Sequence, residues 1–109
     1  MSGEGTHSGE AAVLVDRSFG VRGQSYDLSE IRRTGAGHLL RVRIHRDSYP
    51  QQSYARVEVL TPAMTWTDLA DEPAAAWHSG TPSRSTTATP LENIAERLFQ
   101  RAAAILHTA

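Results

Sequence analysis

Strict alternation of apolar and polar residues marks residues 38–46 and 53–60 as two neighbouring β-strands. The apolar positions of these two segments are Leu40, Val42, Ile44, Ala55, Val57 and Val59. The polar positions between them are Arg41, Arg43, His45, Tyr54, Arg56 and Glu58. Because successive side chains of a strand point to opposite faces, the pattern predicts a hairpin with one apolar and one polar face. The connecting sequence DSYPQQ predicts a loop rather than a tight two-residue turn.

Shorter patterns predict further strands on both sides of this hairpin. Residues 12–17 form an apolar run, and the glycines within 18–25 predict a turn. Residues 26–33 fit either a short capped helix or a strand that pairs with the next one, and we favour the strand. Met64, Trp66 and Leu69 predict another strand over 64–69, with Trp66 in the core.

The C-terminal residues predict one amphipathic helix. Thr89, Pro90 and Glu92 match a helix start, as cap, first helical residue and capping-box acid. The apolar residues that follow at helical spacing are Leu91, Ile94, Ala95, Leu98, Phe99, Ala102, Ile105 and Leu106. We therefore predict an α+β fold, an antiparallel β-meander of three to five strands packed by one C-terminal helix.

The chain length of 109 residues allows one domain, which we assign to residues 12–109. Residues 1–11 lack large apolar side chains and predict a disordered tail, and the Ser/Thr/Pro-rich residues 79–90 predict a loop. There is no cysteine, which excludes disulfides and thiolate chemistry. We find neither a signal peptide nor an apolar run of about 20 residues, so we expect a cytoplasmic protein without a membrane partner.

Arginine supplies all eleven basic residues, and eight of them fall between Arg17 and Arg56, although the net charge is only -1. The polar hairpin face therefore has three interpretations. It is a solvated sheet face stabilised by pairs such as an arginine with Glu58, a surface that binds protein or a second copy, or a nucleic-acid surface. The candidate binding residues on this face are Arg41, Arg43, His45, Tyr54 and Arg56.

Two further residues are candidates for partner binding. Tyr49 lies in the loop at 47–52, which is either organised by its own side chains, with Asp47 accepting a backbone N–H, or serves in recognition. Trp77 follows the sequence DEPAAA and either covers an edge of the core or is exposed, where it would anchor a partner.

Catalytic and metal-binding patterns are poorly developed. His38 and His45 are seven residues apart on one predicted strand, which places them on opposite faces and prevents them from sharing a metal ion. A hydrolytic site built from His45, Asp47 and Tyr49 is conceivable. We nevertheless expect no enzyme activity, no cofactor and no metal.

The sequence RIHRDSY at residues 43–49, with QSYARVE at 52–58 and Trp66, resembles segments of small uncharacterised proteins of actinobacteria and their phages. This resemblance covers residues 43–66 and implies a high-GC bacterial or mobile-element origin, which agrees with the missing lysine. It implies no catalytic residue.

The sequence as a whole predicts a small noncatalytic interaction or accessory protein. A chain of this size buries a modest core, so a partner would help to stabilise it. We expect it to bind a protein partner, or itself as a homo-oligomer, through the sheet face or the helix. The alternative is binding of single-stranded nucleic acid or RNA through the arginine-rich hairpin face.

Overall fold

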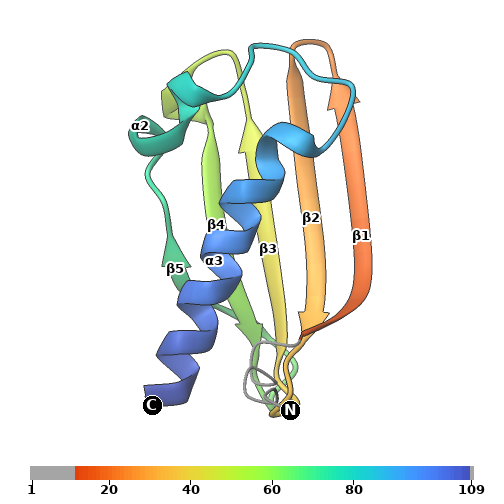
Figure 1. Ribbon diagram of the computed structural model, residues 1–109, viewed down its shortest axis with the longest axis vertical. Coiled ribbons are helices and arrows are strands. Elements are labelled where there is room, and N and C mark those ends of the chain that lie inside the picture. The colour runs from red at the N-terminus through yellow and green to blue at the C-terminus, as the bar shows by residue number, and fades with distance from the viewer. Residues whose placement is uncertain (1–11, 109) are drawn as a thin grey trace, which may run out of the picture.

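A five-stranded antiparallel sheet with one long helix on one face makes up the protein (Figure 1). The computed structural model describes residues 12–108, and the predicted disordered tail lies outside the described residues. The strands are β1 (Val13–Arg22), β2 (Ser25–Arg33), β3 (Leu39–Arg46), β4 (Tyr54–Leu60) and β5 (Trp66–Asp71). The helical segments are η2 (Pro50–Gln52), α2 (Ala74–Trp77), η3 (His78–Gly80) and α3 (Thr89–Thr108). The strands lie in the sheet in chain order, which confirms the predicted α+β meander.

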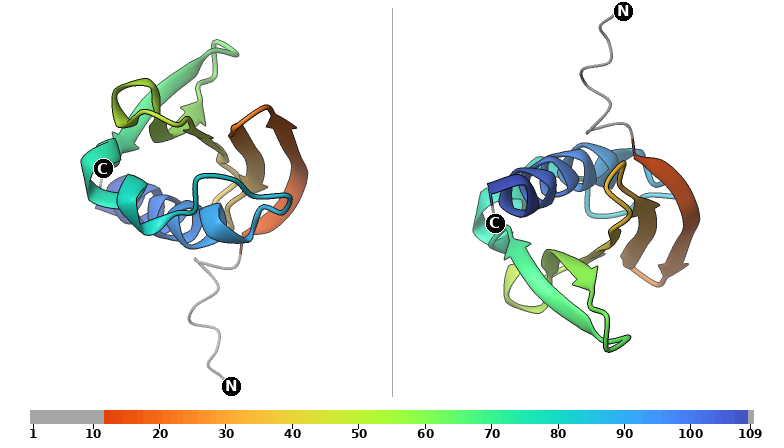
Figure 2. Two further views of the ribbon diagram at one scale, coloured as in Figure 1. Left: turned by 90° about the horizontal axis from the view of Figure 1, so that it is seen from above. Right: turned by 90° about the horizontal axis from the view of Figure 1, so that it is seen from below.

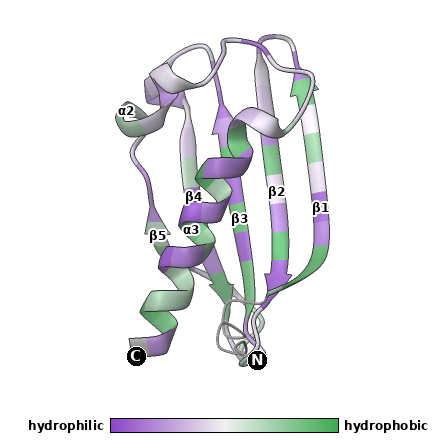
Figure 3. Ribbon diagram, in the orientation of Figure 1, coloured by the Kyte–Doolittle hydropathy of each residue, from purple (hydrophilic) through white to green (hydrophobic). Residues whose placement is uncertain are grey.

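The alternation in β3 and β4 is confirmed, because the aliphatic side chains of this face lie against α3, all buried except the partly buried Val59. Figure 3 shows this alternation as bands of hydrophilic and hydrophobic colour along the strands. The predicted helix stripe supplies the other side of the core, with Leu91, Ile94, Leu98 and Phe99 all buried. Each such side chain contributes about 1.5–3 kcal/mol when it leaves water. Seen end on, α3 lies on one side of the sheet, while the β4–β5 hairpin extends away from the helix (Figure 2).

The first two strands are longer than predicted. β1 continues through Ser18 and Gly20, which we had placed in a turn, and ends at Arg22, which pairs with Ser25. Only Gly23 and Gln24 remain between the strands, and Gly23 has φ 59, a left-handed value that suits glycine at the first position of a two-residue turn. Residues 26–33 form a strand, as we favoured. Pairing with β2 along its whole length outweighs the low strand propensity of Gly20.

The last strand begins later than predicted, and Trp66 is not in the core. Met64 has φ 66 and is exposed in the turn at 61–65, so the strand begins at Trp66. Trp66 pairs with Leu60, which puts its side chain on the sheet face opposite α3. There the guanidinium carbon of Arg41 lies 4.3 Å from the centre of the Trp66 ring.

Trp77 lies in the core, on the short helix α2 that the sequence analysis did not predict. Its side chain is 4% exposed and its Nε1 donates a hydrogen bond to the carbonyl oxygen of Glu72, at 3.1 Å. This burial corrects the candidate role of Trp77 as an exposed anchor. The chain adopts it because the indole is the large apolar group available to cover this end of the sheet.

Buried Arg46 organises the segment between α2 and α3. Its guanidinium donates hydrogen bonds to the hydroxyl and the carbonyl oxygen of Thr81, each at 3.0 Å, and to the carbonyl oxygen of His78 at 3.3 Å. The Tyr26 hydroxyl donates to the carbonyl oxygen of Pro82 at 2.6 Å. Burial raises the pKa of Tyr26 above its usual value, although the charge of Arg46 acts in the opposite direction. The segment is therefore fixed to the top of β2 and β3.

Candidate functional site

The polar face of the hairpin lies opposite α3, and we call it the outer face. Arg41 Nε lies 2.8 Å from one carboxylate oxygen of Glu58, and an Arg43 terminal nitrogen lies 3.1 Å from the other. Arg41 and Glu58 are direct cross-strand partners, so the register of β3 and β4 brings them together. The predicted pairing of an arginine with Glu58 is confirmed, and it involves two arginines.

Glu58 is 4% exposed although it lies on the outer face. Burial raises the pKa of this carboxyl, but the hydrogen bond from Arg41 and the charges of Arg43 and Arg41 outweigh burial and lower it below its usual value. Glu58 is therefore ionised at neutral pH and offsets much of the positive charge of its two neighbours.

The aromatic and histidine side chains of the outer face also have partners. The Tyr54 ring stacks on His45, with ring centres 5.7 Å apart, and the guanidinium carbon of Arg56 lies 4.5 Å from the centre of the same ring. His45 Nδ1 lies against the Asp27 carboxylate, and its Nε2 lies 3.6 Å from a carboxylate oxygen of Asp47. These carboxylates make the outer face a mixed surface rather than a continuous cationic one.

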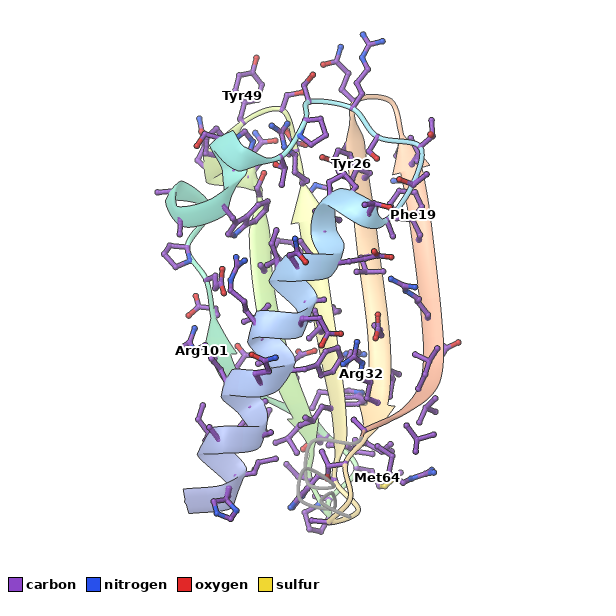
Figure 4. The ribbon with its side chains drawn as sticks, viewed as in Figure 1. Phe19, Tyr26, Arg32, Tyr49, Met64 and Arg101 are labelled. Atoms are coloured by element: carbon purple, nitrogen blue, oxygen red, sulfur yellow. The ribbon has the colours of Figure 1, made fainter. Side chains whose placement is uncertain are left out.

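The structure brings together five of the predicted binding residues and separates two. Arg41, Arg43, His45, Tyr54 and Arg56 share the outer face. Tyr49 is exposed at the end of the sheet (Figure 4), and Trp77 is in the core on the other side. Three or more side chains able to hold a metal ion do not occur together within residues 12–108.

The loop that carries Tyr49 is organised by its own side chains. Asp47 Oδ1 accepts a hydrogen bond from the Tyr49 backbone N–H at 3.2 Å, as predicted. The Ser53 hydroxyl accepts from the Asp47 N–H at 2.8 Å and donates to the Tyr49 carbonyl at 3.0 Å. These bonds hold both ends of the loop and leave the Tyr49 ring in solvent.

Strand β1 forms an exposed apolar edge that the sequence analysis did not identify. Its side chains Val13, Leu14, Val15 and Val21 are 46–63% exposed. Within residues 12–108, β1 pairs with β2 along one side and with no strand along the other. Figure 1 shows β1 at the edge of the sheet away from α3, which packs on β3, β4 and β5. The sequence held one signal, because the first strand of a meander that follows chain order is always an edge.

Ion pairs connect β1 and β2 to α3, which packs on β3, β4 and β5. Buried Glu30 binds Arg32 Nε at 2.6 Å and Arg17 Nε at 3.2 Å. Arg17 also reaches Glu92 of the helix at 2.8 Å, and Arg32 pairs with Glu96. The side chains on the helix side of β1 thus position this strand through polar contacts. Its free edge, opposite β2, pairs with no strand of residues 12–108.

Comparisons with family models, with curated proteins and with solved structures found no match. Over residues 12–108, no helix has the length and apolar character needed to cross a bilayer.

Proposed function

We propose that this protein is a small noncatalytic interaction domain that binds another protein chain by adding a strand to the β1 edge. The observation that carries this proposal is the ten-residue edge strand with four exposed large aliphatic side chains. An edge strand presents unpaired backbone N–H and C=O groups along its free side. An extended segment that pairs with the regular part of this edge gains a row of hydrogen bonds and covers the exposed side chain of Val21.

The length of β1 supports this use of the edge. Exposed edges are commonly protected by proline, charged side chains, short length or bulges. β1 has ten residues and no proline, and its protective features are the register shift between Leu14 and Asp16 and three charged residues, of which Arg17 is already paired with Glu30 and Glu92. The residues from Asp16 to Arg22 pair regularly with β2 and offer a template without bulges.

The outer face supports the nucleic-acid alternative less well. Phosphate binding requires guanidinium groups whose charge is available, and Arg41 and Arg43 are already bound to Glu58. Tyr54, the residue expected to stack on a base, is in contact with His45 and Arg56.

The proposal is tested with two matched double variants. Val15→Lys/Val21→Lys adds charges to the β1 edge, whereas Tyr49→Lys/Met64→Lys adds the same charges to exposed apolar residues in loops. We expect light-scattering mass and affinity capture to detect an associated chain, of the same or another kind, with the wild type and the loop variant but not with the edge variant. Association that survives in the edge variant, or none in any form, contradicts the proposal.

A further inference from the structure

We infer that the chain that occupies the β1 edge is a second copy of this protein, paired antiparallel about a two-fold axis through Phe19. This inference rests on the proposed function, because it names the partner of that same edge. It follows from symmetry, from the extent of the regular part of β1, and from the positions of two charges.

Symmetry limits the possible registers of such a pair. In a continuous antiparallel sheet, residues directly opposite each other point to the same face. Side chains of one strand alternate between faces, so a residue can only oppose one that is an even number of positions away in the sequence. The two-fold axis of a symmetric pair must then pass between two copies of the same residue.

The regular part of β1 has Phe19 at its midpoint. It begins after the register shift at Asp16 and ends at Arg22, where the turn with Gly23 follows. Centring the pair on Phe19 therefore uses every residue from Asp16 to Arg22. Centring it on Arg17 would shorten the ladder and put two guanidinium groups opposite each other.

The charges of β1 are complementary in the same register. Asp16 lies opposite Arg22 of the second copy, and the symmetry makes this pair twice. Both residues are exposed, and neither has a salt bridge to another residue of the described part of the chain. Opposite charges placed directly across an antiparallel pair stabilise it. Asp16 of one copy is thus free to bind Arg22 of the other.

The remaining positions of this register are sterically open. Ser18 lies opposite Gly20, and a Cβ added at Gly20 would contact no heavy atom within 4 Å. Arg17 lies opposite Val21, so its aliphatic stem covers an exposed valine. At the axis the two Phe19 rings meet on the helix side, beside Tyr26, whose ring centre is 6.4 Å from that of Phe19 (Figure 4).

Charge exchange tests the register. Asp16→Arg places two arginines opposite each other, and Arg22→Asp places two aspartates opposite each other. We expect each variant to raise the dimer dissociation constant about tenfold or more in sedimentation equilibrium. The double variant Asp16→Arg/Arg22→Asp restores opposite charges and should return the constant to within about threefold of the wild type. Dimerisation that is unchanged by the single variants, or not restored by the double variant, overturns this register.

Cross-linking tests the same register independently. The chain has no cysteine, so introduced thiols have no native competitor. A mixture of Ser18→Cys and Gly20→Cys chains should form a disulfide-linked heterodimer on mild oxidation, because opposite residues are within reach of a disulfide. Either variant alone should remain unlinked, since its thiols are displaced diagonally by two positions. Self-linking of Ser18→Cys with no mixed product would overturn the Phe19 axis.

The outcomes separate this inference from the proposed function. A wild-type chain that stays monomeric up to about 1 mM overturns self-pairing. If that monomer still captures a foreign chain that the Val15→Lys/Val21→Lys variant fails to capture, the proposed function stands. If no association depends on the edge, both are wrong. Circular dichroism of each variant confirms that loss of pairing does not reflect loss of folding.

Discussion

The two edges of the sheet differ in length, exposure and neighbouring elements. β5 has six residues and is followed by Glu72, Pro73 and α2. The helix also binds the end of β5, because Arg101 donates to the Asp71 carbonyl at 2.9 Å and Arg97 pairs with Glu72 at 2.7 Å. β1 has ten residues, four exposed large aliphatic side chains, and no covering element among residues 12–108.

This difference determines what the chain can assemble into. A sheet with two open edges can add copies at both ends and grow into a fibre. Within residues 12–108, β5 also lacks a strand on its free side, but it is shorter than β1 and α3 binds its end. The two edges therefore do not offer equal templates for pairing.

The largest expected effect comes from removing the buried indole of Trp77, which binds the carbonyl oxygen of Glu72 just beyond β5. Trp77→Ala leaves a cavity beneath α2 and should lower the free energy of unfolding by about 3–5 kcal/mol in urea denaturation. Amides of β5 should then exchange with solvent nearly as fast as those of β1. The control Tyr49→Ala removes an exposed ring and should change stability by less than about 0.5 kcal/mol. A Trp77→Ala variant as stable as the control would contradict the role of this indole in the core.

Glu58, on the neighbouring strand β4, contributes to the stability of the fold in a pH-dependent way. Glu58→Gln leaves Arg41 and Arg43 without their carboxylate and should cost about 1–3 kcal/mol at pH 7, less than for a fully buried pair because both arginines are partly exposed.

The pKa of Glu58 is lowered in the folded state, so its contribution is present above the unfolded pKa and is lost as the pH falls through the folded pKa. The difference in the free energy of unfolding between wild type and Glu58→Gln should therefore shrink below about pH 4. The exposed acid Asp68 provides the control, as Asp68→Asn. A difference in the free energy of unfolding that stays constant from pH 7 to pH 3 contradicts a lowered pKa of Glu58.

Arg17 links β1 to β2 and to α3 through ion pairs. Arg17→Ala removes its pairs with Glu30 and Glu92 and should cost about 1 kcal/mol, since Arg17 is partly exposed. Hydrogen exchange should accelerate in β1 and stay unchanged in β5. The matched variant Arg97→Ala should produce the reverse pattern, because its partner Glu72 follows β5. Equal acceleration at both edges would mean that neither arginine acts locally.

The smallest effect on stability is expected from adding a charge to an exposed aliphatic position of β1. Leu14→Lys changes an exposed side chain and should alter the free energy of unfolding by less than about 0.5 kcal/mol. The same change should slow aggregation of concentrated protein on heating, which turbidity measures. Val59→Lys, at a partly buried core position, serves as the contrast and should be strongly destabilising.

The sequence predicted those parts of the fold that depend on local periodicity. Alternation identified β3 and β4 and the shared face of Arg41, Arg43 and His45, and the helical stripe identified α3. Periodicity could not place Met64 and Trp66. The pattern predicted a strand from residue 64, but Met64 has a positive φ and lies in the turn, so the strand begins two residues later, at Trp66. A helix as short as α2 has no periodic signal, so the sequence left open whether Trp77 is buried or exposed.

A meander in chain order makes β1 an edge strand, but the exposure of its aliphatic side chains could not be predicted. No local pattern distinguishes exposed Val13 from a buried valine. The burial of Glu58 likewise requires Arg41 and Arg43 to cover it from the neighbouring strand.

The chain-order arrangement of the sheet also affects how quickly the protein can form. Every strand pairs with the strand made just before it, so each step closes a short loop and loses little chain entropy. Hairpins can be added one after another, and α3, the last segment, docks on a surface that is already assembled. Such local connectivity favours rapid folding for a β-rich chain, which shortens the time during which unpaired strands are exposed to one another.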